Sequence, residues 1–181
     1  MDKVFWKAHK ALADKLEEMR RIEAERDRMD GLPPPPFRVV LTNGCFDVLH
    51  IGHVQCLKWA RERGDCLVVA VNDDWGVKEL KGDDRPVNFM EHRLYMLEAL
   101  KCVDFAVPFH GTKATELFRA IRPDVYVKGG DYTLDTLDAE EREALLSWEP
   151  KPEFLFFPFM TDISTTKILE RGAGHAGKRR R

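Results

Sequence analysis

Two histidines with a glycine between them, His50-Ile51-Gly52-His53, are the residues of this chain whose types and spacing most clearly suggest chemistry. They follow an apolar run at 39–42 and a turn at Gly44. Helical periodicity begins directly after them, so both rings are expected on one side of the first turn of a helix. Unpaired backbone N–H groups and the positive end of the helix dipole make such a start an anion site. Two imidazoles that titrate near neutral pH would add donors and positive charge there.

The motif alone leaves two other roles open for these histidines. They could ligate a metal together with Cys45, but no second cysteine or carboxylate lies at ligand spacing, so the sequence predicts no metal site. They could also serve only as helix caps. The glycine turn matches neither G-x-G-x-x-G nor G-x-x-x-x-G-K-[ST], which argues against a dinucleotide dehydrogenase and a Walker-type kinase. The favoured hypothesis is that this corner holds the phosphates of a nucleotide while one of them is transferred.

Three later loops carry related chemistry. Lys81 and Arg85 lie in a polar loop, residues 128–131 form a Lys-Gly-Gly-Asp turn, and residues 164–166 place three hydroxyls at the start of the last helix. Taken alone, the cations of the first loop are more typical of a solvated face, the second loop is equally consistent with a solvated turn, and an N-cap would explain one of the three hydroxyl residues. The chain shows no Ser-His-Asp pattern, activated cysteine or paired glutamates. Phosphoryl or nucleotidyl transfer needs none of these, because positioning and positive charge from His, Lys, helix starts and Mg²⁺ suffice.

Strand-like and helix-like segments alternate from Phe37 onward, which predicts an α/β fold. The pattern calls for a Rossmann-like, doubly wound parallel sheet of about five strands with helices on both faces. The four polar loops would then meet beyond the carboxyl ends of the strands, at the topological switch point. A capping box from Asn88 to Glu91 is expected to open one helix. The expected strands are 39–42, 66–71, 105–108, 125–127 and 154–157, and the expected helices are 54–63, 88–100, 115–121, 137–148 and 164–170.

The sequence predicts that the chain is divided into three parts. Residues 4–29 read as an amphipathic helix, and Gly31 with four prolines follows as a stiff spacer, so 1–36 is a helical extension. This helix could pack on the domain or on a second copy of the chain, which leaves a homo-oligomer open. Residues 37–171 form the catalytic domain. Residues 172–181 read as a flexible basic tail, since the basic run 178–181 follows two glycines.

Bulk composition excludes several classes of protein. The 181-residue chain has a net charge of -2, so no nucleic-acid partner is expected. It has no apolar run long enough to cross or enter a membrane. Its four cysteines show no C-x-x-C spacing and are expected to be free thiols. These features predict a soluble cytoplasmic protein.

The motifs together resemble a known family. Residues 42–53 are similar to the opening motif of the HxGH nucleotidyltransferase superfamily. Residues 80–88, 127–132 and 163–166 narrow the resemblance to the adenylyltransferases that make ADP-heptose from D-glycero-D-manno-heptose 1-phosphate and ATP. The likeness covers about residues 37–170 in order. The first motif marks only the superfamily, and the two lysine-glycine loops carry the narrower likeness.

This resemblance implies ATP, with Mg²⁺, and a sugar phosphate as ligands. His50 and His53 would stabilise the α-phosphate, and Lys81 would neutralise charge between the two substrates; these three are the expected catalytic residues. Asp131 and its loop would face the nucleotide or the sugar. The expected nucleotide-binding residues are Gly44, Cys45, Phe46, His50, Gly52, His53, Asp131, Ser164, Thr165 and Thr166, and the expected substrate-binding residues are Asp47, Lys81, Arg85, Arg93, Lys128 and Gly130.

The residues leave other functions open. Many relatives carry a fused sugar kinase for which this chain has no room, so a separate kinase is expected upstream. Glycerol 3-phosphate with CTP, or flavin mononucleotide with ATP, would use the same chemistry. A non-catalytic nucleotide-binding module is the alternative from another class.

Overall fold

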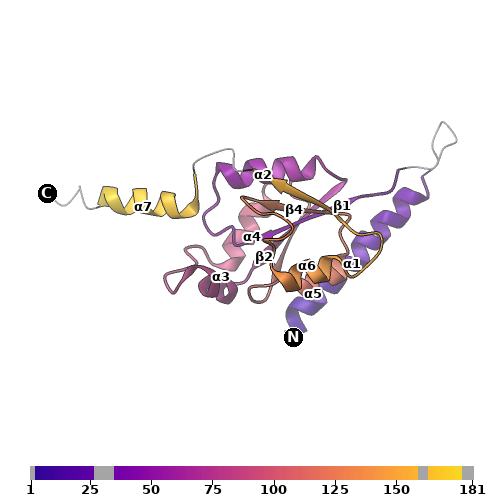
Figure 1. The fold of residues 1–181 in the computed structure, drawn as a ribbon, viewed down its shortest axis with the longest axis horizontal. Coiled ribbons are helices and arrows are strands. Elements are labelled where there is room, and N and C mark those ends of the chain that lie inside the picture. Colours follow the sequence, from indigo (N-terminus) through magenta and orange to yellow (C-terminus); the bar gives the residue numbers. More distant parts are fainter. Residues whose placement is uncertain (1–2, 27–34, 159–162, 177–181) are drawn as a thin grey trace.

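The computed structural model describes residues 3–26, 35–158 and 163–176 (Figure 1). A five-stranded parallel sheet forms its centre, in the order β3-β2-β1-β4-β5. This confirms the predicted Rossmann-like fold. The strands are β1 (Val39–Gly44), β2 (Cys66–Asn72), β3 (Phe105–Phe109), β4 (Val125–Gly129) and β5 (Glu153–Phe157). The helices are α1 (Lys3–Ala24), α2 (Ile51–Arg61), α3 (Asp74–Lys81), α4 (Met90–Glu98), α5 (Thr115–Ile121), α6 (Ala139–Leu145) and α7 (Thr165–Ala176).

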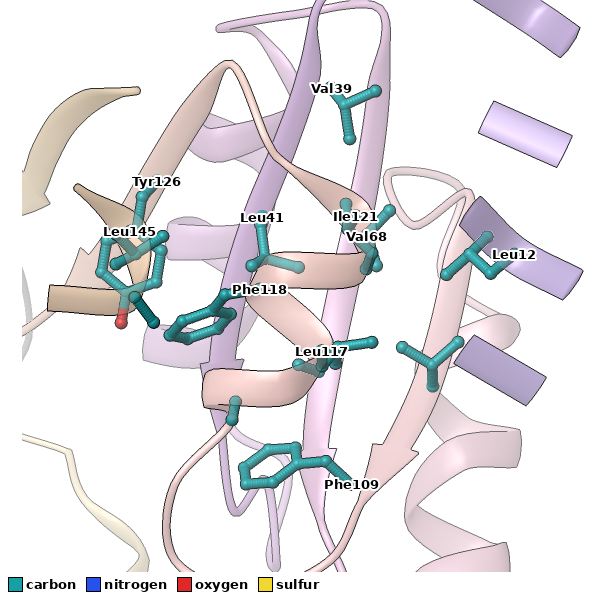
Figure 2. Close-up of a cluster of buried hydrophobic side chains, with 14 of the residues drawn as sticks. Leu12, Val39, Leu41, Val68, Phe109, Leu117, Phe118, Ile121, Tyr126 and Leu145 are labelled. Atoms are coloured by element: carbon teal, nitrogen blue, oxygen red, sulfur yellow. The ribbon is translucent and has the colours of Figure 1, made fainter. Parts of the chain in front are cut away.

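The central strands are buried on both faces, as their uninterrupted apolar runs predict. Alternate residues of β2 point to opposite sides, with Val68 in one core and Leu67 in the other. The first core lies under α1, α5 and α6, and Figure 2 shows Leu41, Leu117, Phe118 and Tyr126 packed within it. The second core lies under α2 and α4. The sheet is therefore covered by helices on both sides.

The strand order creates a switch point between β1 and β4. The chain moves outward from β1 through β2 to β3, and then returns to place β4 on the other side of β1. Residues 40–42 of β1 pair with residues 125–127 of β4 in parallel register. The loops after these two strands diverge to opposite faces, which opens a crevice at their carboxyl ends.

Helix α1 packs on the α/β domain. Leu12 and Leu16 are buried in the same core as β1 and β2. Near one end of the helix, His9 Nε2 donates to the carbonyl of Pro108 in β3 at 2.7 Å. Near the other end, Arg20 pairs with Asp124, just before β4, at 2.9 Å. The segment that the sequence marks as an extension is thus part of the folded unit.

Three local predictions need correction. Helix α3 covers residues 74–81, where no helix was expected, so Lys81 ends a helix rather than opening a loop. Helix α4 begins without a side-chain cap, because the Asn88 side chain donates to the Asp47 carbonyl. Helix α7 continues to Ala176, beyond its predicted end at residue 170, and extends away from the sheet (Figure 1).

The basic run at 178–181 and most of the proline spacer lie outside the residues that the structure describes. Cys45, Cys56, Cys66 and Cys102 are all free, as expected. None of the helices in the described ranges combines the length and the apolar character needed to span a bilayer.

Candidate active site

The two histidines form the start of α2 and cap it reciprocally. His50 is the N-cap residue, and its Nδ1 accepts from Gly52 N at 3.1 Å. His53 Nδ1 accepts in turn from His50 N at 3.4 Å, and the two rings stack with their centroids 3.8 Å apart. The capping role is therefore present, but it uses only the Nδ1 atoms. In a neutral ring an accepting Nδ1 places the proton on Nε2, so both residues keep an Nε2–H donor.

Both rings are less basic than the sequence suggests. Burial lowers the pKa of His50, and burial together with the neighbouring His50 lowers the pKa of His53 to about 4. The expectation that His53 would titrate near neutral pH is thus corrected. At pH 7 it acts as a neutral hydrogen-bond donor, and positive charge at the site comes from lysines.

Acidification is expected to destabilise the protein through His53. Its pKa of about 4 lies below the value of 6.5 in an unfolded chain, so between these values the unfolded state binds more protons. The free energy of unfolding should fall by at most about 1.4 kcal/mol per pH unit in this window, and not change through this group above it. Denaturant titrations at about pH 7 and about pH 5 should show a smaller loss in His53→Asn than in the wild type. Equal losses would contradict the assignment.

A cleft of about 520 Å³ lies over the carboxyl ends of β1 and β4. It brings together residues from loops that are far apart in the chain. Lys81 reaches it from the end of α3, and Lys128 reaches it from β4. The predicted site residues that line it are Gly44, Cys45, Phe46, Asp47, His50, Gly52, His53, Lys81, Arg85, Lys128, Ser164, Thr165 and Thr166.

Asp47 and Arg85 form an ion pair with each other. The Asp47 carboxylate accepts from Arg85 Nε, from Val87 N at 2.8 Å and from Asn88 N at 2.9 Å. Its side chain is almost completely buried. This arrangement ties the loop after α3 to the loop after β1. Both residues border the cleft, but the Asp47 carboxylate is saturated by these donors.

Arg93 lies beneath the cleft rather than in its lining. It is completely buried and donates to the carbonyls of Asn88 at 3.0 Å and Cys45 at 2.6 Å, and to Asp74 Oδ1 at 2.8 Å. Its guanidinium therefore holds the backbone of the loop at 44–50, between β1 and α2, which is called the phosphate loop below after the role expected from the sequence. Gly130 and Asp131 are also outside the lining: Gly130 N donates to Phe157 O, and Asp131 is exposed.

The turn between β1 and the histidines needs its glycine. Phe46 has a positive φ of 47°, and its ring packs 5.2 Å from the His53 ring. A Cβ at Gly44 would lie 3.2 Å from the Phe46 ring, which is tighter than ordinary contact. Cys45 donates its thiol to Asn72 Oδ1 at 3.7 Å, and burial raises its pKa. The described residues include no cluster of three or more His, Cys, Asp or Glu suited to a metal ion.

The start of α7 completes the cleft. Thr165 Oγ1 donates to the Val48 carbonyl at 3.3 Å, which joins this helix start to the histidine loop. Ser164 Oγ accepts from Lys167 N at 3.3 Å, so Ser164 has the N-cap contact that the sequence left open. Two helix N-termini, those of α2 and α7, thus border one cleft.

Several cleft residues were missed by sequence reasoning. Asn43 is one of them: its Oδ1 accepts from Lys128 Nζ and from Tyr126 OH, both at 2.7 Å, and its Nδ2 donates to Glu141 Oε1, a second missed residue, at 3.0 Å. Burial lowers the pKa of Lys128, although Glu141 opposes this effect. Other polar side chains of this kind are Thr42, Asn72, Thr112, Lys113, Tyr132 and Asp138. Glu141 shares the buried face of α6 with Ala144 and Leu145, and that spacing is the signal that could have found it.

Comparison with models of protein families identifies the family of this chain. A model of cytidylyltransferase-like proteins matches residues 41–171. The chain belongs to the cytidylyltransferase-like family. It is a nucleotidyltransferase, and the matched range contains all thirteen predicted residues that line the cleft.

Curated relatives extend the cytidylyltransferase-like assignment. The chain is 47% identical over 134 residues to the bifunctional protein HldE of Alcanivorax borkumensis, and 44% identical over 137 residues to that of Sulfurimonas denitrificans. These matches cover 74% and 76% of the chain, but 27% of each relative. The chain thus matches about a quarter of the length of these relatives. A lipopolysaccharide core biosynthesis protein from Thermoplasma volcanium has a similar structure, with a TM-score of 0.59 and 25% identity, over 68% of this chain and 98% of that one.

Proposed function

We propose that this nucleotidyltransferase transfers an adenylyl group from ATP to D-glycero-D-manno-heptose 1-phosphate, giving ADP-heptose and pyrophosphate. The observation that carries the proposal is the shared cleft, where two helix N-termini, two imidazole Nε2 donors and two lysines converge. The similarity to HldE proteins, and to a lipopolysaccharide core biosynthesis protein, supports a heptose as the sugar.

The mechanism needs positioning and charge rather than a nucleophilic side chain. A phosphate oxygen of the sugar phosphate attacks the α-phosphorus of ATP, and the bond to the β-phosphate bridging oxygen breaks as pyrophosphate leaves. His50 and His53 would donate their Nε2–H groups to the α-phosphate oxygens, where charge builds up. Lys81 and Lys128 would neutralise charge on the two substrates, and the α7 start at 164–166 would bind nucleotide phosphates.

Three expected site residues take other places in this proposal. Arg93 would act by holding the Cys45 carbonyl, and so the phosphate loop, rather than by touching a phosphate. Asp131 and Gly130 would act through the position of their loop at the end of β4. Mg²⁺ would be held by the ATP phosphates, because the described residues offer it no carboxylate cluster. When bound, it would neutralise phosphate charge.

A matrix of nucleotides and acceptors tests the proposal. Pyrophosphate release is measured with ATP or CTP against heptose 1-phosphate, glycerol 3-phosphate and flavin mononucleotide. We expect turnover with ATP and heptose 1-phosphate. Turnover with CTP alone would favour the second candidate, a cytidylyltransferase, which the family description supports. Binding of ATP without release from any pair would indicate a nucleotide-binding module.

The acceptor must carry its phosphate before this reaction. A separate sugar kinase is therefore proposed as the preceding enzyme. Addition of such a kinase with free heptose should make pyrophosphate release independent of added heptose 1-phosphate.

A further inference from the structure

The cleft has a second half whose chemistry differs from that of the histidine corner. The histidines come from α2, on the face of the sheet that α2 and α4 cover. Thr112, Lys113, Asp138 and Glu141 line the cleft from the opposite side, where α5 and α6 pack. Two of these four side chains are carboxylates, so this half is poorly suited to phosphate.

Glu141 is held rigidly at the floor of this half. It is 5% exposed, and its Oε1 accepts from Asn43 Nδ2 at 3.0 Å and from Ala114 N at 2.9 Å. Its Oε2 accepts no hydrogen bond from the part of the chain that the structure describes. In that part, Gln55 Oε1 is the only fully enclosed side-chain polar atom without a hydrogen-bond partner. Glu141 Oε2 also has no partner, so it is not fully enclosed. Because Glu141 lines the cleft, its Oε2 is reachable from the cleft.

The cations nearby are engaged with other groups. Lys113 Nζ lies 2.6 Å from Glu140 Oε1 and 3.4 Å from Asp138 Oδ2. Lys128 Nζ donates to Asn43 Oδ1. Glu141 Oε2 is thus a fixed acceptor, which repels a phosphate and attracts a hydroxyl through a charge-assisted hydrogen bond.

Asn43 connects the two halves of the cleft. It precedes Gly44, where the phosphate loop begins, and its side chain contacts both Glu141 and Lys128. A small acceptor with its phosphate at the histidine corner would therefore direct its uncharged part toward Glu141. In a sugar 1-phosphate, that uncharged part carries hydroxyl groups.

We infer that Glu141 is a specificity-determining residue whose Oε2 accepts a hydrogen bond from a hydroxyl of the sugar phosphate. The inference rests on the proposed function and assigns the recognition of the sugar to the α6 side of the cleft. Glu141 would select polyhydroxylated acceptors without taking part in bond breaking.

Glu141→Gln tests the assignment at a single atom. Asn43 Nδ2 and Ala114 N require an acceptor, so the glutamine oxygen should replace Oε1 and its NH₂ should replace Oε2. We expect kcat/KM for heptose 1-phosphate to fall about 10- to 100-fold, mainly through KM. The KM for ATP and the melting temperature should not change. Glu143→Gln, an exposed change on the same helix, is the matched control and should behave as the wild type.

Monodeoxy analogues of heptose 1-phosphate give a second measurement, on the wild type and on Glu141→Gln. The wild type should disfavour one analogue about 10-fold or more, and Glu141→Gln should lose this preference. An unchanged sugar KM in Glu141→Gln, or equal use of all analogues by the wild type, would overturn the inference while leaving the proposed function standing. Absence of wild-type turnover with any sugar phosphate would instead overturn the proposed function, and this assignment with it.

Discussion

Replacing His50 by asparagine should lower kcat about 100-fold or more while leaving the protein folded. Asparagine is a favourable N-cap residue, so its side-chain oxygen can accept from Gly52 N as His50 Nδ1 does. It has no group in the place of Nε2–H. The substitution therefore separates the capping role from the proposed donation to the α-phosphate, and pyrophosphate release together with a thermal melt measures both.

His92→Ala is the matched control for this experiment. His92 is an exposed histidine on α4 and does not line the cleft. Its loss should change neither kcat nor the melting temperature. Full activity in His50→Asn would show that the histidine pair is only a helix cap, whereas loss of the thermal transition would show that capping by imidazole is indispensable.

Replacing Arg93 by alanine should cost about 3–5 kcal/mol of folding free energy and abolish turnover. The change would leave the carbonyls of Cys45 and Asn88 without their donor, and would leave a cavity where a completely buried side chain had been. Because the Cys45 carbonyl belongs to the phosphate loop, the loop should also lose its position. Urea denaturation and pyrophosphate release measure the two effects.

Two further variants are compared with Arg93→Ala: Arg93→Lys, which keeps the charge, and Arg119→Ala, which is the exposed control. Lysine keeps the charge but cannot reach three acceptors in a planar fork, so most of the loss should persist. Arg119 forms an exposed pair with Glu116, and its removal should cost less than about 1 kcal/mol. If Arg93→Ala denatures at the wild-type urea concentration, then the buried guanidinium does not support the loop.

The strands were predictable because their signal is local. The run at 66–71 is apolar throughout, and such a run suits a strand that is covered on both faces. Helix α3 was missed for the opposite reason. It has only eight residues, contains Gly76 and buries Gly76 and Val77 alone, so its sequence offers too few turns to show a helical repeat. Gly76 is required there by a distant segment, since a Cβ would lie 2.0 Å from the Gly111 carbonyl oxygen.

The site was predictable where backbone geometry dictates residue type, as at the histidine corner. It was less predictable where a charged residue is buried by tertiary contacts. Glu141 lies in an acidic run that resembles a solvated helix face, and only its contact with Asn43 makes it part of the cleft. Arg93 was expected in the site only through the family resemblance, and its burial could not be predicted because its three acceptors come from separate earlier segments of the chain.

The contact between α1 and Pro108 affects how copies of this protein meet at high concentration. Strand β3 is an edge of the sheet, and an exposed edge is a template on which another chain can add a strand. Pro108 has no N–H to offer, and its carbonyl already accepts from His9. At this point the edge has neither donor nor acceptor for an incoming backbone. A strand added along this edge would therefore lose its pairing at Pro108, which works against the continuous strand pairing that leads to aggregates.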